Sequence, residues 1–150
     1  MKKVFRRTYE YAAHIAPDPD GGFLVTFPDV PEAITCGGDR QDAKQSAADA
    51  LGLALRGYLA AGHSLPEPRT KARQEDLVVS PDAADALKLA VIETFQASGL
   101  SKAELARRLG KAETEAYRIL DPDHPTKLSA LEAALAVLGK KVVISVQDAA

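Results

Sequence analysis

One stretch constrains the chain more than any other, because it specifies two short helices and the turn between them. It covers residues 100–120. Ser101 followed by Glu104 has the spacing of a capping box, which predicts that a helix begins there. Gly110 favours a left-handed turn and predicts where that helix ends. A second short helix then follows, with Ala116 on its apolar face. This order is the helix-turn-helix plan.

Two interpretations fit this stretch. In a helix-turn-helix, the second helix can lie in the major groove of DNA with its N-terminal residues toward the bases. Ala106 is small where two helices must cross closely, and Gly110 lies in the turn, so both favour this interpretation. The alternative is an ordinary helical hairpin that uses the same two residues for packing alone.

Composition narrows the classes of protein and site. The 150 residues have a formal net charge of −2, so nucleic-acid binding needs a local basic patch or a dimer. The single cysteine, Cys36, excludes an intramolecular disulfide and suits a reducing cytosol. A lone cysteine with the scattered His14, His63 and His124 makes no zinc cluster. We expect no metal or cofactor, and we expect Cys36 to be a small core residue, with a reactive thiol as the alternative.

The sequence contains no targeting or membrane segment. It starts with MKKVFRR, which is basic but is not followed by the apolar run of a signal peptide. No apolar stretch is long enough to cross a bilayer. We therefore expect a cytoplasmic protein with no membrane partner.

The first half of the chain predicts a small α+β domain. Residues 4–37 alternate in strand fashion around the turn at 18–22, which indicates a β-hairpin with one buried face followed by a short third strand at 32–36. Asp39 then caps a long helix with an apolar stripe of 3.6-residue period, which ends near Ala61 and Gly62. This helix is expected to lie across the sheet.

This half resembles the HicB antitoxin family in its order of elements. The residues that carry the resemblance are Asp20-Gly21-Gly22-Phe23, Phe27-Pro28-Asp29-Val30-Pro31, Ile34-Thr35, Ala43 and Leu65-Pro66-Glu67-Pro68. One departure is Glu32-Ala33, where the family often has Gly-Cys. The resemblance implies a three- or four-stranded sheet with one helix, likened to a partial ribonuclease H fold. It also implies that this domain binds a HicA toxin, which is an mRNA-cleaving ribonuclease.

The second half predicts a helical domain after a connection. Residues 69–76 are interpreted as a linker, and residues 77–79 as a short strand that either returns to the N-terminal sheet or is extended linker. Ser80 and Pro81 are typical of a helix start. The helices expected over residues 81–139 resemble the DNA-binding domain of the Cro/C1 repressor family, which HicB proteins frequently carry at this place.

That resemblance assigns DNA-binding roles by position. The first motif helix would approach a phosphate through its first residue, and the turn and second helix would face base edges or the backbone. The helix that follows would bind phosphate through its N-terminus. The candidate DNA-binding residues are Lys102, Lys111, Ala112, Glu113, Thr114, Tyr117, Arg118, Thr126 and Lys127.

Acidic residues complicate this assignment. Glu113 and Glu115 place negative charge on the helix that would face DNA, and Ala112 stands where Ser or Thr is common. Three interpretations remain open: weak DNA binding that depends on a dimer, a fold kept for protein contacts, or carboxylates that stabilise the helix N-terminus.

The tail at residues 140–146 alternates apolar residues and predicts a strand. A single strand after a helical domain needs a partner, and pairing with its copy in a second subunit would supply one. This predicts a homodimer matching a palindromic operator, while a tetramer through the N-terminal domain is a further option. A disordered or internally docked tail is the alternative.

Taken with the resemblance, these features predict a non-enzymatic antitoxin and autorepressor. Its parts are a toxin-binding domain at 1–68, a connection at 69–80 and a DNA-binding and dimerisation domain at 81–150. Its expected partners are a HicA-like toxin and operator DNA. One alternative is a stand-alone transcriptional regulator whose N-terminal domain binds another protein or ligand. The other is a ribonuclease H-like nuclease that uses Asp18, Asp20 or Asp29, although aspartates also simply favour such turns.

Overall fold

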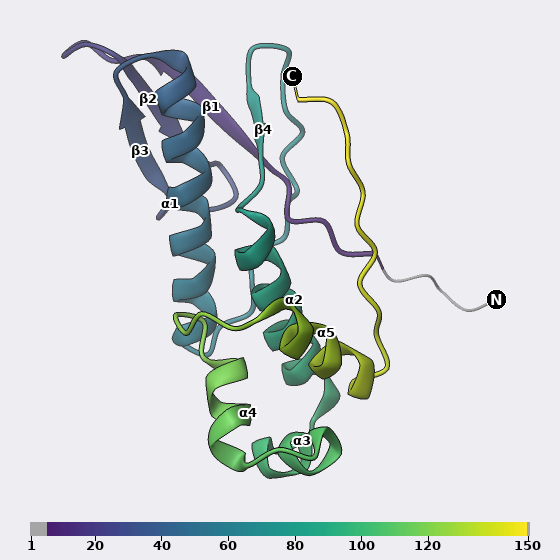
Figure 1. The fold of residues 1–150 in the computed structure, drawn as a ribbon. Helices are drawn as coiled ribbons and strands as arrows, with labels where there is room; N and C mark the ends of the chain where they lie inside the picture. Colours follow the sequence, from purple (N-terminus) through teal and green to yellow (C-terminus); the bar gives the residue numbers. More distant parts are fainter. Residues whose placement is uncertain (1–5, 150) are drawn as a thin grey trace. The chain divides into compact units, whose positions relative to one another are not determined.

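The computed structural model describes residues 6–149, drawn in Figure 1. The chain divides into two compact units, residues 1–90 and 91–150, and each is described by itself. The elements are β1 (Tyr11–Pro17), β2 (Phe23–Thr26), β3 (Ile34–Gly37), α1 (Arg40–Ala60), β4 (Leu77–Val79), α2 (Ala83–Ser98), α3 (Lys102–Leu109), α4 (Glu113–Leu120) and α5 (Leu128–Val137). The predicted α+β class is confirmed. The basic start of the chain and the beginning of the predicted strand region, residues 1–5, lie outside the described residues.

The sheet of the first unit has four antiparallel strands in the order β3-β2-β1-β4. Ile15 of β1 faces Val25 of β2, and Ala12 of β1 faces Val78 of β4. The hairpin, the short third strand and the return of residues 77–79 to the sheet are therefore all confirmed.

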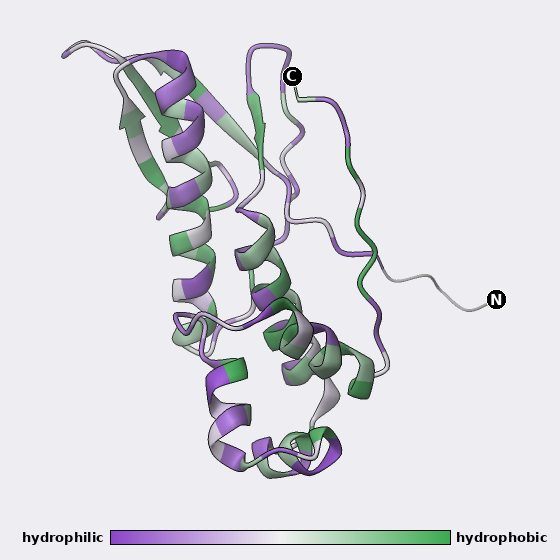
Figure 2. Cartoon of the chain, in the orientation of Figure 1, coloured by the Kyte–Doolittle hydropathy of each residue, from purple (hydrophilic) through white to green (hydrophobic). Residues whose placement is uncertain are grey.

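Helix α1 covers one face of this sheet, as predicted. Its N-cap is Asp39, whose side chain accepts a 2.8 Å hydrogen bond from the backbone N–H of Asp42. Hydrophobic and hydrophilic residues alternate along the helix (Figure 2), and its buried apolar residues are Ala43, Ala47, Leu51, Leu55 and Leu59. Gly37 of β3 lets the helix approach closely, because a Cβ there would lie 2.2 Å from the backbone nitrogen of Ala43.

Residues 69–76, interpreted from sequence as a linker, are tied to the first unit. Asp29 accepts hydrogen bonds from the Thr70 backbone N–H at 2.8 Å and from its hydroxyl at 2.9 Å. Asp76 bonds the His14 ring nitrogen Nδ1 at 2.8 Å and the Arg73 guanidinium at 3.1 Å. The segment is thus held to the sheet through buried or half-buried carboxylates.

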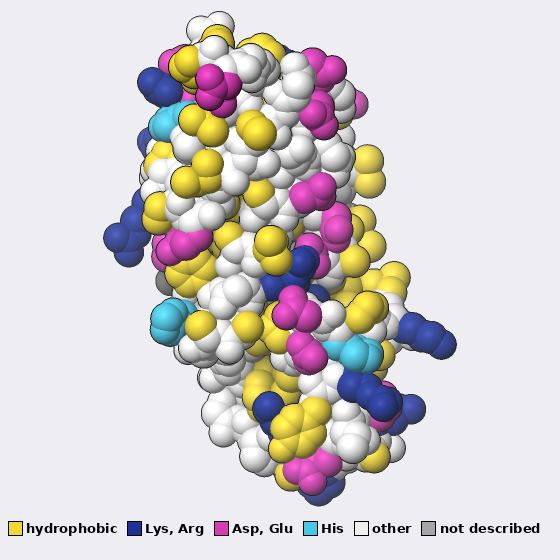
Figure 3. All heavy atoms as spheres, turned by 90° about the vertical axis from the view of Figure 1, so that its left-hand side faces the viewer, with side chains coloured by type: hydrophobic (Ala, Val, Ile, Leu, Met, Phe, Trp, Pro, Cys, Tyr) yellow, Lys and Arg dark blue, Asp and Glu magenta, His cyan; other side chains and the backbone are white. Residues whose placement is uncertain are grey.

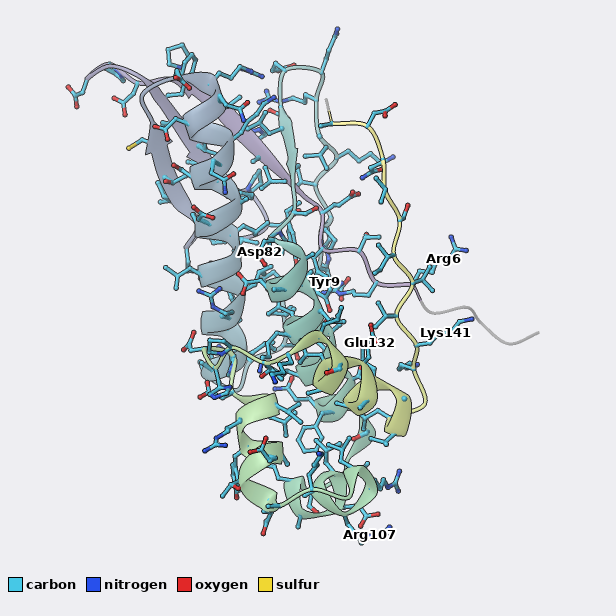
Figure 4. The ribbon with its side chains drawn as sticks, viewed as in Figure 1. Arg6, Tyr9, Asp82, Arg107, Glu132 and Lys141 are labelled. Atoms are coloured by element: carbon cyan, nitrogen blue, oxygen red, sulfur yellow. The ribbon has the colours of Figure 1, made fainter. Side chains whose placement is uncertain are left out.

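Two expectations for the start of α2 and for Cys36 were wrong. Helix α2 begins at Ala83, after Pro81, and its first turn is capped by Asp82, which accepts from the Asp85 backbone N–H at 2.7 Å and is labelled in Figure 4. The cap is therefore Asp82 and not the predicted Ser80, because the Asp82 carboxylate reaches the Asp85 backbone N–H. Cys36 is exposed rather than part of the core, because it pairs with Leu24 on the sheet face opposite α1.

In the second unit, α3, α4 and α5 pack together around buried Leu105, Ala116 and Leu131. The predicted C-terminal strand is absent: within the described residues, 140–149 contain no strand, and the chain runs on from α5 as an extended tail (Figure 1). A strand needs a neighbouring strand for its backbone groups, and in the described part of this single copy no strand pairs with the tail.

Candidate functional site

The turn between α3 and α4 has the geometry that the sequence predicts. Ser101 caps α3 by accepting from the Glu104 backbone N–H at 3.1 Å, and Gly110 ends it in a left-handed conformation with φ 65°. The next N–H, of Lys111, bonds the Ala106 carbonyl at 3.0 Å, which closes the turn. Because Ala106 is buried and small, the two helices can lie close together.

Most candidate DNA-binding residues lie on exposed positions around this turn. Lys111 and Ala112 form the turn, and Glu113 and Thr114 begin α4. The structure brings two candidates from different helices together, since the Lys102 ammonium lies 4.4 Å from the centre of the Tyr117 ring. Arg118 is exposed beside Tyr117 on α4, while the remaining two candidates, Thr126 and Lys127, lie in the loop before α5. The half-buried Thr126 hydroxyl donates to the His124 carbonyl at 3.3 Å.

Carboxylates hold the arginines of these two helices. Glu104 accepts from Arg107 Nη2 at 2.6 Å and from Arg108 Nε at 3.0 Å, and Glu115 accepts from Arg118 Nη1 at 2.7 Å. The Arg107 hydrogen bonds, followed by those of Arg108, lower the pKa of Glu104 to about 2. The sequence reasoning did not identify these pairs, although acidic and basic residues three and four positions apart signal them.

Acidic and basic side chains are consequently mixed around α4, as the lower end of Figure 3 shows. Ala112 forms the N-cap of α4 without a side-chain hydrogen bond, and Glu113 and Glu115 lie in the first turn. Carboxylates at this end stabilise the helix dipole. The helix therefore carries a net charge of −1, from Glu113, Glu115 and Arg118.

A second candidate surface, which we call the outer sheet face, lies on the side of the sheet away from α1. Its exposed apolar residues are Leu24, Ile34, Cys36 and Val78. The strand register places them on one face with Thr26 and His14. An antiparallel sheet usually presents polar residues to water on its open face, so these exposed apolar residues make this face a candidate surface for a protein contact. The alternation of Ile34, Thr35 and Cys36 is a sequence signal of one apolar strand face, but it does not tell whether α1 covers that face.

The aspartates of the nuclease alternative serve the local structure. Asp18 Oδ1 accepts from the Asp20 backbone N–H at 2.9 Å within the β1–β2 turn, and Asp29 is bonded to Thr70. Among residues 6–149, the structure has no cluster of three or more histidine, cysteine or acidic side chains that could hold a metal ion. No helix in the same range is long and apolar enough to cross a membrane.

Comparison with known proteins extends across both units. Residues 10–90 match the family model for the HicB_like antitoxin of bacterial toxin-antitoxin system. Antitoxin HicB of Escherichia coli (strain K12) is 33% identical over 132 residues, covering 88% of this chain and 95% of that protein. Antitoxin HicB of Pseudomonas fluorescens is 33% identical over 94% of this chain and 96% of its own length. Antitoxin HicB 2 of Photorhabdus laumondii is 39% identical over 79% of this chain and 84% of its own length.

These matches agree with the sheet-and-helix order of the first unit, since the family model covers β1 through β4. The chain belongs to the HicB-like antitoxin family of bacterial toxin-antitoxin systems.

Proposed function

We propose that the chain is a cytoplasmic antitoxin that neutralises a HicA-type mRNA interferase by direct binding and represses its own operon by binding operator DNA. In this proposal residues 1–68 bind the toxin together with β4, the rest of residues 69–80 connects, and residues 81–150 bind DNA and dimerise. It acts by binding, not by catalysis. The observation that carries the proposal is membership of the antitoxin family over most of the chain.

The outer sheet face is the surface proposed for the toxin. Ile34 and Val78 are 62% and 63% exposed there. Covering such side chains removes apolar area from water, which favours association by about 25 cal/mol per Å² before the costs of binding. The face is supported by β strands and backed by α1, so it is preformed rather than a loop that must be ordered on binding.

The α3–α4 surface is proposed for operator DNA. The closed turn at Gly110 and the exposed side chains of Lys102, Thr114, Tyr117 and Arg118 support this part. The carboxylates of α4 disfavour DNA binding because they repel the phosphates. Binding by one copy is therefore expected to be weak and salt-sensitive, and a homodimer doubles the number of contacts to a palindromic site. A tetramer would need further contacts from the first unit.

Toxin binding is tested by co-expressing the chain with the small open reading frame beside its gene and purifying through a tag on the chain. We expect a stable complex and restored growth. Ile34→Asp should weaken the complex at least ten-fold, since burying a carboxylate there costs more than about 1.4 kcal/mol. Leu53→Asp is the matched control, because Leu53 is 63% exposed on α1. Equal loss in both variants would contradict the proposed face, and no complex with any variant would remove the toxin-binding claim.

Operator binding is tested by titrating the purified chain with DNA from upstream of its gene at several salt concentrations. Lys102→Ala and Arg118→Ala should each weaken binding, with a smaller dependence on salt. Lys71→Ala, which changes an exposed lysine of the first unit, is the control. Absence of binding at low salt would contradict this half of the proposal and leave the antitoxin half standing.

A further inference from the structure

The contact between Lys102 and Tyr117 joins the first residue of α3 to the second turn of α4. The ammonium lies 4.4 Å from the ring centre, within the distance at which a cation is attracted to the face of an aromatic ring. Tyr117 is 51% exposed, so the pair lies at the surface and not in the core. Arg118, the next residue along the chain, is also exposed.

The partner of Lys102 differs in kind from the partners of the nearby arginines. Arg107, Arg108 and Arg118 are each bound to a carboxylate, which offsets their positive charge. A tyrosine ring is neutral, so it holds the Lys102 ammonium through its quadrupole and leaves the net charge in place. At this surface the aromatic contact therefore fixes a cation without cancelling it.

We propose that Tyr117 is a positioning residue for DNA binding, whose ring holds the Lys102 ammonium beside α4 where it meets a backbone phosphate. This inference rests on the proposed operator binding and adds a role that depends on the ring and not on the hydroxyl. Lysine has a flexible four-carbon stem, so holding its end in advance reduces the ordering cost of the phosphate contact.

The first test is a double-mutant cycle on DNA affinity with Tyr117→Phe, Tyr117→Leu and Lys102→Ala. Tyr117→Phe keeps the ring and should bind DNA as the parent does. Tyr117→Leu should weaken binding about three-fold, the size expected of an exposed cation–ring contact. Lys102→Ala should reduce the salt slope by about 0.9, the loss of one phosphate contact. In the Lys102→Ala background, Tyr117→Leu should have no further effect.

The second test needs no DNA. A side chain above an aromatic ring experiences the ring current, so the ε-CH₂ protons of Lys102 should resonate upfield of those of Lys111 in NMR spectra of the full chain. We expect this upfield shift to persist in Tyr117→Phe and to vanish in Tyr117→Leu, while the amide spectrum of each variant shows that the helices remain folded.

Each departure from these results has a distinct meaning. If Tyr117→Phe binds as weakly as Tyr117→Leu, the hydroxyl contacts DNA and the positioning role is overturned. If Tyr117→Leu weakens binding equally with and without Lys102, the ring contacts DNA directly and the role is again overturned. If the parent chain does not bind DNA while the NMR shift is present, the proposed operator binding fails and the inference fails with it, although the contact itself exists.

Discussion

Arg56 of α1 and Asp85 of α2 form an ion pair in which Arg56 Nη1 lies 2.5 Å from Asp85 Oδ2. Gly52 lies one turn before Arg56 and leaves room for this pair, because a Cβ at that position would lie 2.6 Å from the same oxygen. Both residues of the pair are about three-quarters buried, with side-chain exposures of 23% and 24%. The pair therefore fixes the start of α2 against α1 within the first unit.

Replacing Gly52 should show how much the Arg56–Asp85 ion pair contributes to stability. Ala is a better helix former than Gly by about 1 kcal/mol, and Gly57→Ala, where a Cβ meets no atom within 4 Å, should be stabilising by about that amount. The free energy of unfolding of Gly52→Ala should be about 1–3 kcal/mol lower than that of Gly57→Ala, because the Cβ at position 52 pushes the Asp85 carboxylate away from Arg56. Urea unfolding followed by circular dichroism measures both. Equal stability of the two variants would show that Asp85 moves aside without loss.

Asp76 should make the stability of the first unit depend on pH. Its side chain is 1% exposed, and hydrogen bonds from Arg73 hold the pKa of this carboxyl well below its ordinary value. A pKa lowered in the folded state gives stabilisation that is complete above the unfolded pKa of about 3.9 and is lost as the pH falls below it. Asp76→Asn should therefore lower the unfolding temperature at neutral pH.

The pH profile provides the control for this prediction. The difference in unfolding temperature between the parent chain and Asp76→Asn should shrink steadily below about pH 4. Asp20→Asn, at an exposed turn position, removes one carboxylate without touching the His14 or Arg73 contacts. A difference that stays constant with pH would mean that the Asp76 charge does not contribute.

Local patterns in the sequence predicted most helices and strands because caps and turns act over a few residues. Helix α3 begins after Ser101 and ends at Gly110 as expected, and Asp39 caps α1. The cap of α2 was misplaced by two residues, from Ser80 to Asp82, and the other errors in the first unit concern partners far along the chain. Cys36 faces outward because of its register with Leu24, and the bonds from Asp29 and Asp76 hold residues 70–76 to the sheet.

The same distinction applies to the candidate surfaces. The residues around the α3–α4 turn could be chosen from their positions in the motif, but the contact between Lys102 and Tyr117 depends on how two helices cross. The outer sheet face was missed because strand alternation alone does not tell which side of the sheet α1 covers. Burial resolves this, since Val25 is buried while Leu24 beside it is not.

Ala112→Ser should stabilise the second unit. The backbone of Ala112 is extended, with φ −67° and ψ 152°, close to that of the capping Ser101 with φ −78° and ψ 160°. The Glu115 N–H already donates to the Ala112 carbonyl at 3.0 Å, so a serine there would accept from the Thr114 N–H, and such a cap typically adds about 0.5–1 kcal/mol. Thermal unfolding measures the gain. Ala103→Ser, within the first turn of α3, is the control and should give none; a gain in both variants would argue against capping.

The C-terminal tail should control self-association. Ile144 is 76% exposed, and the strand period places it on the same side as Val146 and opposite Ser145. If two tails pair as strands, this side is the apolar one that the dimer buries. Ile144→Asp should therefore shift the chain from dimer to monomer in light scattering after size exclusion, while Ser145→Asp should not. A chain that is monomeric before any substitution would contradict tail pairing, whereas a dimer that withstands Ile144→Asp would locate the dimer contact elsewhere.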